Sequence, residues 1–445
     1  MGSEKQPHFV IVGGGLSGAL AACYLGAAGY RVDVYEMRGD MRSGGIPGGK
    51  SINLALSHRG IEGLRRVGLA DAVLERAVPM HGRMMHAVSG SLSYQPYGRD
   101  TSQCINSVSR GQLNITLLEA ADAHEGVTLH FHEKCTDVDI DTGDVRIKNT
   151  ETGHTRTVHA DIIISADGAF SAVRRAMQRR DGFDYSQSWL KHGYKELAIP
   201  ASANGAFALE KHALHIWPRH SYMMIALPNE DGSFTCTLFW PFAGENSFEA
   251  IKTEGDLLRF FSRDFPDAVP LMPTLVKDYF ANPVGSLVTV RCSPWYHRDK
   301  VLLLGDAAHA IVPFYGQGIN AGFEDVLVLG ECMDRFGDDW ERVFKETHRL
   351  RKDDVDALAD LALYNFVEMR DNAGKRRFLW HKKLERFLHR VFPKWYIPLY
   401  SMATFTRMPY RLAVRRAKRQ DRAVAFAAAI AVVVVVAAVW RWTVR

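Results

Sequence analysis

The sequence has few cysteines and no spacing typical of a structural metal site. Its six cysteines are scattered over 445 residues and form no Cys-x-x-Cys pair. This pattern excludes a disulfide-stapled secreted domain and a zinc module, so we expect reduced, buried thiols and no metal. The chain passes from a polar start directly into an apolar strand, which predicts no secretory signal peptide.

The chain also lacks an excess of basic residues outside its C-terminal tail. The net charge is +5, yet the segment Arg407–Arg422 holds seven Lys/Arg against one Asp, and Arg441 and Arg445 add two further positive charges. The remainder, which we call the body, therefore has a net charge of −3. A mildly acidic body argues against a nucleic-acid-binding protein.

Long apolar runs are absent except at one place. Residues 423–440 read AVAFAAAIAVVVVVAAVW, without a charge, and at about 1.5 Å per residue they would span roughly 27 Å as a helix. The basic segment RRAKRQDR precedes the run, and Trp440 and Trp442 end it. We predict a membrane anchor over 423–442 with the body on the cytosolic side. The alternatives are a buried core helix or an unstructured tail.

The first 38 residues predict a dinucleotide-binding unit. An apolar strand, HFVIV, ends in glycines, an Ala-rich helix follows, and a second strand, RVDVYE, ends at Glu36. Gly13, Gly15 and Gly18 fit the spacing GxGxxG, which allows a tight turn, a close approach of a pyrophosphate and close packing of the helix on the strand. Glu36 is placed to accept hydrogen bonds from ribose hydroxyls. This unit alone does not separate FAD from NAD.

Two later segments extend the pattern. In ADIIISADG a buried strand from Asp161 to Ser165 is followed by Ala-Asp-Gly, which contains Asp167, and in VLLLGDAAHAIVPFYGQGIN Asp306 lies just past the strand VLLL. Carboxyl ends of strands are where open α/β sheets bind ligands, so Asp306 is expected to accept a hydrogen bond from a polyol chain such as ribityl. Gly316 and Gly318 allow the backbone to approach a ring, and a helix beginning near Ile319 would direct its positive end toward that ring.

The overall pattern predicts an α/β protein with a Rossmann-like, doubly wound FAD-binding sheet, an inserted antiparallel-sheet domain and a helical C-terminal block that ends in a transmembrane helix. Helical patterns dominate residues 51–123, strands dominate 127–168 and 194–239, and helices follow residue 324. We expect two FAD-binding segments, at 1–180 and 286–340, with a sheet-rich substrate domain between them at 181–285. A helical region follows at 341–422, and the anchor at 423–442.

Several longer blocks carry a resemblance to a known family. They include MHGRMMH, PYGRD, NSVSRGQLN, FDYSQSWLKHGYKEL, GDAAHAIVPFYGQGINAGFED, YNFVEMR and PLYSMATF, and they cover nearly the whole chain. In these blocks the sequence resembles the kynurenine 3-monooxygenases, single-component flavoprotein hydroxylases with the para-hydroxybenzoate hydroxylase fold.

The resemblance implies the chemistry. FAD would be bound tightly and reduced by NADPH, for which the sequence holds no second GxGxxG unit. Dioxygen would form a flavin C4a-hydroperoxide that converts L-kynurenine into 3-hydroxy-L-kynurenine, so the flavin carries the chemistry and no side chain is expected to be catalytic. We interpret His309 as a structural residue. The implied location is the mitochondrial outer membrane.

The resemblance also implies the site residues. Arg83 and Tyr97 match contacts to the substrate carboxylate, Asn365 and Tyr400 match further substrate contacts, and Glu368 lies one helical turn after Asn365. Phe239, Phe314 and Tyr315 are expected to line an aromatic pocket. The expected FAD contacts are Gly13, Gly15, Ser17, Gly18, Glu36, Arg38, Ala55, Arg110, Asp167, Asp306, Gly318, Ile319 and Asn320.

Two alternative functions use the same fold. One is a non-enzymatic binding protein, which intact Asp167-Gly168 and Gly305-Asp306 motifs argue against. The other is a membrane flavin hydroxylase acting on a lipid-like aromatic or isoprenoid. The anchor suits that second alternative, whereas Arg83 and Tyr97 do not, because such a lipid offers no carboxylate.

Overall fold

A mainly parallel sheet of six strands forms the first layer of the fold. The computed structural model describes residues 6–44, 53–98, 101–368 and 376–444. Only the short edge strand β18 runs antiparallel in this sheet. Its six strands are, in spatial order, β18 (Tyr296–His297), β19 (Val301–Leu303), β12 (Ile162–Ser165), β1 (His8–Val12), β2 (Arg31–Tyr35) and β8 (Val127–His130).

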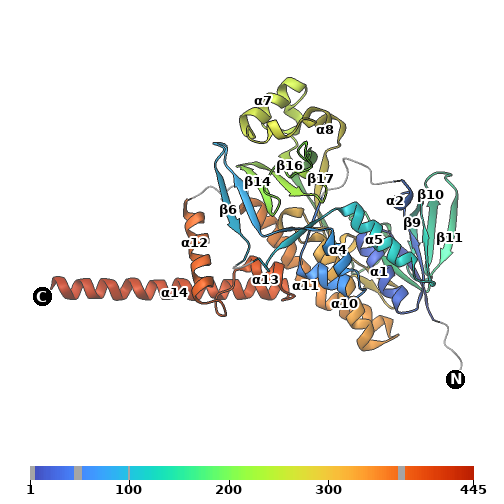
Figure 1. The fold of residues 1–445 in the computed structure, drawn as a ribbon. Helices are drawn as coiled ribbons and strands as arrows, with labels where there is room; N and C mark the ends of the chain where they lie inside the picture. The colour runs from blue at the N-terminus through green and yellow to red at the C-terminus, as the bar shows by residue number, and fades with distance from the viewer. Residues whose placement is uncertain (1–5, 45–52, 99–100, 369–375, 445) are drawn as a thin grey trace.

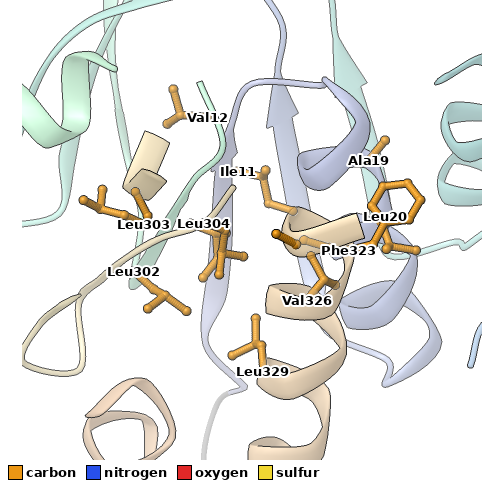
Figure 2. Close-up of a cluster of buried hydrophobic side chains, with 14 of the residues drawn as sticks. Ile11, Val12, Ala19, Leu20, Leu302, Leu303, Leu304, Phe323, Val326 and Leu329 are labelled. Atoms are coloured by element: carbon orange, nitrogen blue, oxygen red, sulfur yellow. The ribbon is translucent and has the colours of Figure 1, made fainter. Parts of the chain in front are cut away.

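Two helices pack against this sheet and against each other. They are α1 (Leu16–Ala27) and α10 (Gly318–Phe336), and α5 (Arg110–Asp122) lies beside α1. Figure 2 shows Phe323 and Val326 of α10 among the apolar residues of β1, β19 and α1, and these side chains are fully buried. The predicted strand–helix–strand unit at the start of the chain is confirmed, and so is the helix beginning near Ile319.

A seven-stranded sheet forms the second layer. Helices α7 (Glu254–Asp264) and α8 (Leu275–Ala281) cover one of its faces, and their apolar side chains form a separate buried cluster with those of the sheet. In spatial order the strands are β17 (Gly285–Ser293), β13 (Asp184–Ile199), β16 (Phe234–Pro241), β15 (Tyr222–Pro228), β14 (Ala213–Arg219), β5 (Gly82–His86) and β6 (Leu92–Pro96). The sheet therefore takes strands from outside the expected 181–285 segment.

The expectation that helices dominate residues 51–123 is only partly right, because the helices His58–Arg65, Ala70–Glu75 and Arg110–Asp122 are interleaved with strands. Within its described residues, 53–98 and 101–123, this part contains five strands, β3 (Leu54–Leu56), β4 (Val78–Met80), β5, β6 and β7 (Ile105–Val108). β3, β7 and β4 form a small antiparallel sheet, and β5 pairs in parallel with β14, about 130 residues later. The strands are three to five residues long, so their sequence shows no usable period.

The remaining elements are short or peripheral. A three-stranded antiparallel sheet, β11-β10-β9, lies at the edge of the molecule away from the second layer (Figure 1). Its strands are β9 (Glu133–Asp139), β10 (Asp144–Asn149) and β11 (Thr155–His159). The short helices are α2 (Met41–Gly44), α3 (His58–Arg65), α4 (Ala70–Glu75), α6 (Ala172–Met177) and α9 (Asp306–His309), with 3-10 turns at Phe248–Ala250, Val269–Leu271 and Pro313–Tyr315.

The C-terminal block is helical, as expected, and residues 340–368 and 376–444 contain four helices. They are α11 (Trp340–Val367), α12 (Arg376–Val391), α13 (Leu399–Phe405) and α14 (Tyr410–Thr443). α14 is one continuous helix that packs on the body at its start and then projects away from it (Figure 1). An apolar stretch of 18 residues in α14 has a mean hydropathy of 2.8, so its length and composition suit a membrane span. None of these residues is buried in the structure, which does not fit the alternative of a buried core helix.

Candidate active site

A cavity of about 390 Å³ lies between the parallel sheet and the seven-stranded sheet. One end is lined by residues that follow the carboxyl ends of three parallel strands: Ser17 after β1, Gly168 after β12 and Asp306 after β19. The other end is lined by Arg83 of β5 and Tyr400 of α13. The first end is where an open α/β sheet binds ligands, so we call it the cofactor end and the second the substrate end.

The glycines of the first turn divide into two kinds. Gly13 has φ +99°, and a Cβ there would lie 2.5 Å from the carbonyl oxygen of Ala166. A Cβ on Gly18 would lie 1.9 Å from the carbonyl oxygen of Gly13, so both glycines are required by packing. A Cβ on Gly15 would meet nothing within 4 Å, because Gly15 faces the cavity. Gly15 caps α1 without a side-chain hydrogen bond, which leaves the first amides of the helix available to an anion.

Asp306 stands at the wall of the cofactor end. Its side chain is open to the cavity, yet protein surrounds it on the other sides, and this burial raises the pKa of its carboxyl despite the opposing charge of Arg110. Arg110 begins α5 and lines the same end. A carboxylate and a guanidinium therefore face one space, in which they can contact hydroxyl and phosphate groups respectively.

The start of α10 closes this end. Gly318 faces open space and Gln317 caps the helix without a side-chain hydrogen bond, so the amides around Gly318 and Ile319 point to the cavity. Asn320 is buried and donates to the carbonyl oxygens of Ala55 (2.8 Å) and Gly316 (3.0 Å). Its side chain therefore holds the lining segments in place rather than facing a ligand.

Three further predicted cofactor contacts, Glu36, Arg38 and Asp167, form hydrogen bonds within the protein. The Glu36 carboxylate accepts from the amide of Gly14 (2.9 Å) and from Arg38 Nε (2.7 Å). Asp167 accepts from Ser165 Oγ (2.6 Å) and from the amide of Ala172 (2.7 Å), and so fixes the start of α6. These carboxylates shape the turns beside the cavity, and contacts to a cofactor would use their remaining lone pairs.

At the substrate end, one guanidinium lies among aromatic rings. Arg83 Cζ is 4.8 Å from the ring centroid of Tyr400 and 5.5 Å from that of Tyr97, and the two tyrosines stack at 5.2 Å. Burial opposes the charge of Arg83, but the neighbouring Tyr400 and Tyr97 raise the pKa of its guanidinium above the usual value. Burial also disfavours the charged form of Tyr97 and therefore raises the pKa of its phenol. The Tyr97 hydroxyl thus stays neutral and can donate a hydrogen bond.

Two polar atoms at this end have no partner among the residues that the structure describes. They are Arg83 Nε and the Tyr97 hydroxyl, both buried. Buried donors without a partner are costly, so a ligand that accepts from both would be stabilised here. A carboxylate has the charge and the two oxygens that this pair requires.

Aromatic side chains form the wall between the two ends. Phe239, Phe314 and Tyr315 line the cavity as expected, and the ring centroids of Phe239 and Phe314 are 4.9 Å apart. Phe366 of α11 stacks on Phe314 at 4.2 Å, and Asn365 donates a short hydrogen bond to the carbonyl oxygen of Phe314. Asn365 thus supports this wall from behind.

Glu368 lies just beyond α11 and does not line the cavity. It is close enough to Tyr315 for its charge to help raise the pKa of that phenol, after burial and Tyr400. Glu368 and Asn365 therefore act near the site through Tyr315 and Phe314 rather than by lining it.

A buried group of charges, not anticipated from the sequence, holds the cofactor end in place. Asp325 of α10 accepts from His309 Nε2 (2.5 Å), Arg351 Nε (2.8 Å) and the amide of Gly305 (3.1 Å). Burial would raise the pKa of Asp325, but His309 and Arg351 outweigh it and keep that pKa below its usual value. Asp325 therefore fixes the turn that presents Asp306, and the structural interpretation of His309 agrees with this geometry.

The neighbouring Glu324 extends this charge group to the C-terminal block. Its carboxylate accepts from Arg59 (2.7 and 2.8 Å) and Arg351 (2.6 Å). Arg59 also donates to the carbonyl oxygen of Ala403 (3.1 Å) and lies 3.9 Å from the ring of Tyr410. The available signal in the sequence was the acidic pair Glu324-Asp325 between the apolar residues of AGFEDVLVLG, because buried carboxylates need cationic partners.

Comparison with known proteins identifies the family. The FAD binding domain family matches residues 8–335. A kynurenine 3-monooxygenase of Myxococcus xanthus is 48% identical over 421 residues, which cover 95% of this chain and 90% of that protein. One of Sus scrofa is 43% identical over 422 residues, which cover 94% and 88%. The chain belongs to the kynurenine 3-monooxygenase family.

Solved structures of other proteins share the fold of this chain. The tetrameric form of 2-methyl-3-hydroxypyridine-5-carboxylic acid oxygenase aligns with a TM-score of 0.67 at 22% identity, covering 84% of this chain and 95% of that one. P. aeruginosa PqsL in complex with 2-aminobenzoylacetate aligns with a TM-score of 0.64 at 20% identity, covering 82% and 97%. The predicted fold class is confirmed.

The geometry fits the cofactor of the family. FAD needs uncapped helix amides for its pyrophosphate, a polar acceptor for its ribityl chain and open backbone beside its ring. The chain offers these at Gly15, at Asp306 and at Gly318, in one cavity. FAD is therefore the cofactor and NADPH its co-substrate, as in the family.

The two kinds of glycine generate a paired test. Gly15→Ala should leave the cofactor-free fold nearly unchanged, because its Cβ meets no protein atom, yet weaken FAD binding by blocking the pyrophosphate. Gly18→Ala should instead destabilise the fold, because its Cβ overlaps the carbonyl oxygen of Gly13. FAD titration and thermal unfolding of the cofactor-free proteins measure the two effects. Equal loss of stability in both variants would contradict this division.

The buried charges give a second expectation. Asp325→Asn removes the carboxylate shared by His309 and Arg351, and should reduce stability by about 3–5 kcal/mol. Glu331→Gln is the matched control, because its ion pair with Arg407 is exposed and contributes about 0–1 kcal/mol. Denaturant unfolding of the flavin-loaded proteins measures both. A loss in Asp325→Asn no larger than in the control would show that the buried charges are dispensable.

Proposed function

We propose that the chain hydroxylates L-kynurenine to 3-hydroxy-L-kynurenine with NADPH and dioxygen. Bound FAD, once reduced, would activate dioxygen. The observation that carries the substrate assignment is the guanidinium of Arg83, with its buried Nε, beside the stacked rings of Tyr97 and Tyr400 at the substrate end of the cavity. A lipid-like aromatic would leave Arg83 Nε and the Tyr97 hydroxyl without partners, which disfavours that alternative.

The side chains of the cavity position the substrate and exclude water. Arg83 would hold the carboxylate by two charge-assisted hydrogen bonds, and the Tyr97 hydroxyl would donate to the same group. The rings of Phe239 and Phe314 would hold the flat aniline ring at the middle of the cavity, toward the cofactor end. Fixing both ends of the substrate sets the ring position that is oxidised.

The long apolar part of α14 supports a membrane location. The body would lie on the cytosolic face, because the basic segment Arg407–Arg422 precedes the apolar run. We propose the mitochondrial outer membrane as the compartment when the chain is in a eukaryotic cell, since a short anchor with basic flanks suits that membrane. Imaging of the full chain fused to a fluorescent protein tests it, and a reticular or plasma-membrane signal would contradict it.

Removal of residues from Ala423 onward should make the body extractable from the membrane without detergent while it keeps FAD. All side chains in the apolar window are free of the body, so the deletion breaks no packing. Membrane fractionation and flavin absorbance measure the two outcomes. A full-length chain that stays soluble without detergent would refute the anchor.

The substrate assignment is tested by Arg83→Ala. Loss of a charge-assisted hydrogen bond should cost about 1.5–3 kcal/mol, which is roughly a 10- to 150-fold loss of kynurenine affinity. Hydroxylation should fall further than binding, with hydrogen peroxide formed from misoriented turnovers. FAD content should stay normal, because Arg83 lies at the substrate end.

Two further variants sharpen that experiment. Arg83→Lys should recover only part of the affinity, because an ammonium lacks the planar two-point grip. Arg76→Ala is the matched control, since Arg76 is exposed and pairs with Glu230 on the surface. A decarboxylated kynurenine analogue should bind the native and Arg83→Ala proteins almost equally. Kynurenine turnover and coupling that survive Arg83→Ala would exclude Arg83 as the carboxylate ligand.

A further inference from the structure

A stripe of apolar side chains lies exposed on α12 and on the turn that follows it. Five side chains in twelve residues are about half exposed: Leu384 (45%), Phe387 (60%), Val391 (48%), Phe392 (52%) and Trp395 (52%). Leu384, Phe387 and Val391 are spaced three and four residues apart, so they lie on one face of the helix. We call these five residues the α12 stripe. Contiguous apolar patches of this kind mark interaction surfaces.

The opposite side of α12 is held against the protein. His389 Nδ1 lies 2.8 Å from the carbonyl oxygen of Tyr396, and Tyr396 is buried. The Tyr396 hydroxyl donates in turn to Asp421 of α14 (3.2 Å). The α12 stripe therefore faces away from these contacts.

The end of the α12 stripe is fixed beside the start of the apolar run of α14. Gln420 accepts from the amide of Ile397 (3.2 Å) and donates to its carbonyl oxygen (2.9 Å), and Arg416 donates to the carbonyl oxygen of Lys394 (3.1 Å). The apolar run begins three residues after Gln420, at Ala423. In Figure 1, α12 lies on the side of the body from which α14 leaves, and it crosses the direction of α14.

Exposed cationic side chains lie near the α12 stripe and just before the apolar run of α14. Arg390 and Lys394 are exposed near the α12 stripe. On α14, directly before the apolar run, Arg415, Lys418, Arg419 and Arg422 are exposed as well. A helix with an apolar face and flanking basic residues binds at the boundary of an anionic lipid layer.

We infer that α12 lies flat in the interfacial layer of the bilayer that α14 spans, with the α12 stripe inserted among the lipid headgroups and upper acyl chains. The inference rests on the proposed membrane anchor and adds a second contact to it. A single span leaves the body free to tilt and rotate above the membrane. A span joined to an in-plane helix by the bonds of Gln420 and Tyr396 fixes the orientation of the body. A second protein chain could also cover such a stripe, but the adjoining apolar span and the basic residues favour lipid.

The test places a fluorescent reporter at single positions of the full-length, flavin-loaded chain in vesicles of phosphatidylcholine and phosphatidylserine. The six native cysteines are buried or half-buried, so an added surface cysteine can be labelled selectively, with the unsubstituted chain as the background. Phe387→Cys reports the α12 stripe, Val436→Cys the span, and Phe280→Cys is the matched exposed control on α8. Quenching is measured with aqueous iodide and with nitroxides attached at the lipid headgroup or deep in the acyl chain.

The expected result separates the three positions. The reporter at 387 should be quenched by the headgroup nitroxide and should lose most of the iodide quenching seen at 280. The reporter at 436 should respond to the deep nitroxide. Flavin absorbance confirms that each variant is folded, and Val391→Cys replaces Phe387→Cys if that variant fails to fold.

Other outcomes overturn the inference in distinguishable ways. Iodide quenching at 387 equal to that at 280, with 436 embedded, would refute the interfacial helix and leave the anchor standing. An iodide-protected reporter at 387 that ignores both nitroxides would show that protein, not lipid, covers the stripe. Iodide access at both 387 and 436 would refute the anchor and the inference together.

Discussion

The two carboxylates buried at the centre of α10 constrain the rest of the structure. Glu324 and Asp325 are almost inaccessible to water, and unpaired charges would be very costly there. Arg59 of α3 and Arg351 of α11 bring the compensating charges from segments 265 residues before Glu324 and 27 residues after it. The helices that carry these arginines must therefore meet α10 in one arrangement. Apolar packing alone would tolerate small shifts along the helix axes, whereas directed ion pairs restrict them.

This arrangement sets both ends of the cavity. Asp325 holds the amide of Gly305, which places the following Asp306 at the cofactor end. Arg351 belongs to α11, and the last turn of the same helix contains Asn365 and Phe366, which support Phe314 in the aromatic wall. One charged group therefore connects the wall that faces the substrate with the turn that faces the cofactor. The chemistry of the cavity depends on residues that do not line it.

Local patterns predicted the cofactor end well and the substrate end poorly. The glycine turn and the α10 start are encoded within about 20 residues each, so spacing alone located Gly15, Asp306 and Gly318. Arg83 lies on the short strand β5, which pairs with β14 far along the chain, and Tyr97 directly follows the short strand β6, which pairs with β5. No local period marks these strands. The roles of Arg83 and Tyr97 came from resemblance, not from pattern. Arg59 lies in the polar segment HRGIEGLR, which looks solvated until α10 is packed against it.

The C-terminal segment combines two physically different parts. Residues from Leu399 to Gln420 complete the cavity, because Tyr400 lines its substrate end and the Tyr410 hydroxyl donates to Gln317 (3.1 Å) at the start of α10. Residues beyond Ala423 have no buried side chain in the apolar window. Since α14 is continuous across the boundary, the helix that packs on the catalytic body is also the helix that would enter the lipid. The membrane end of the chain is thus joined rigidly to both ends of the cavity, without lining it.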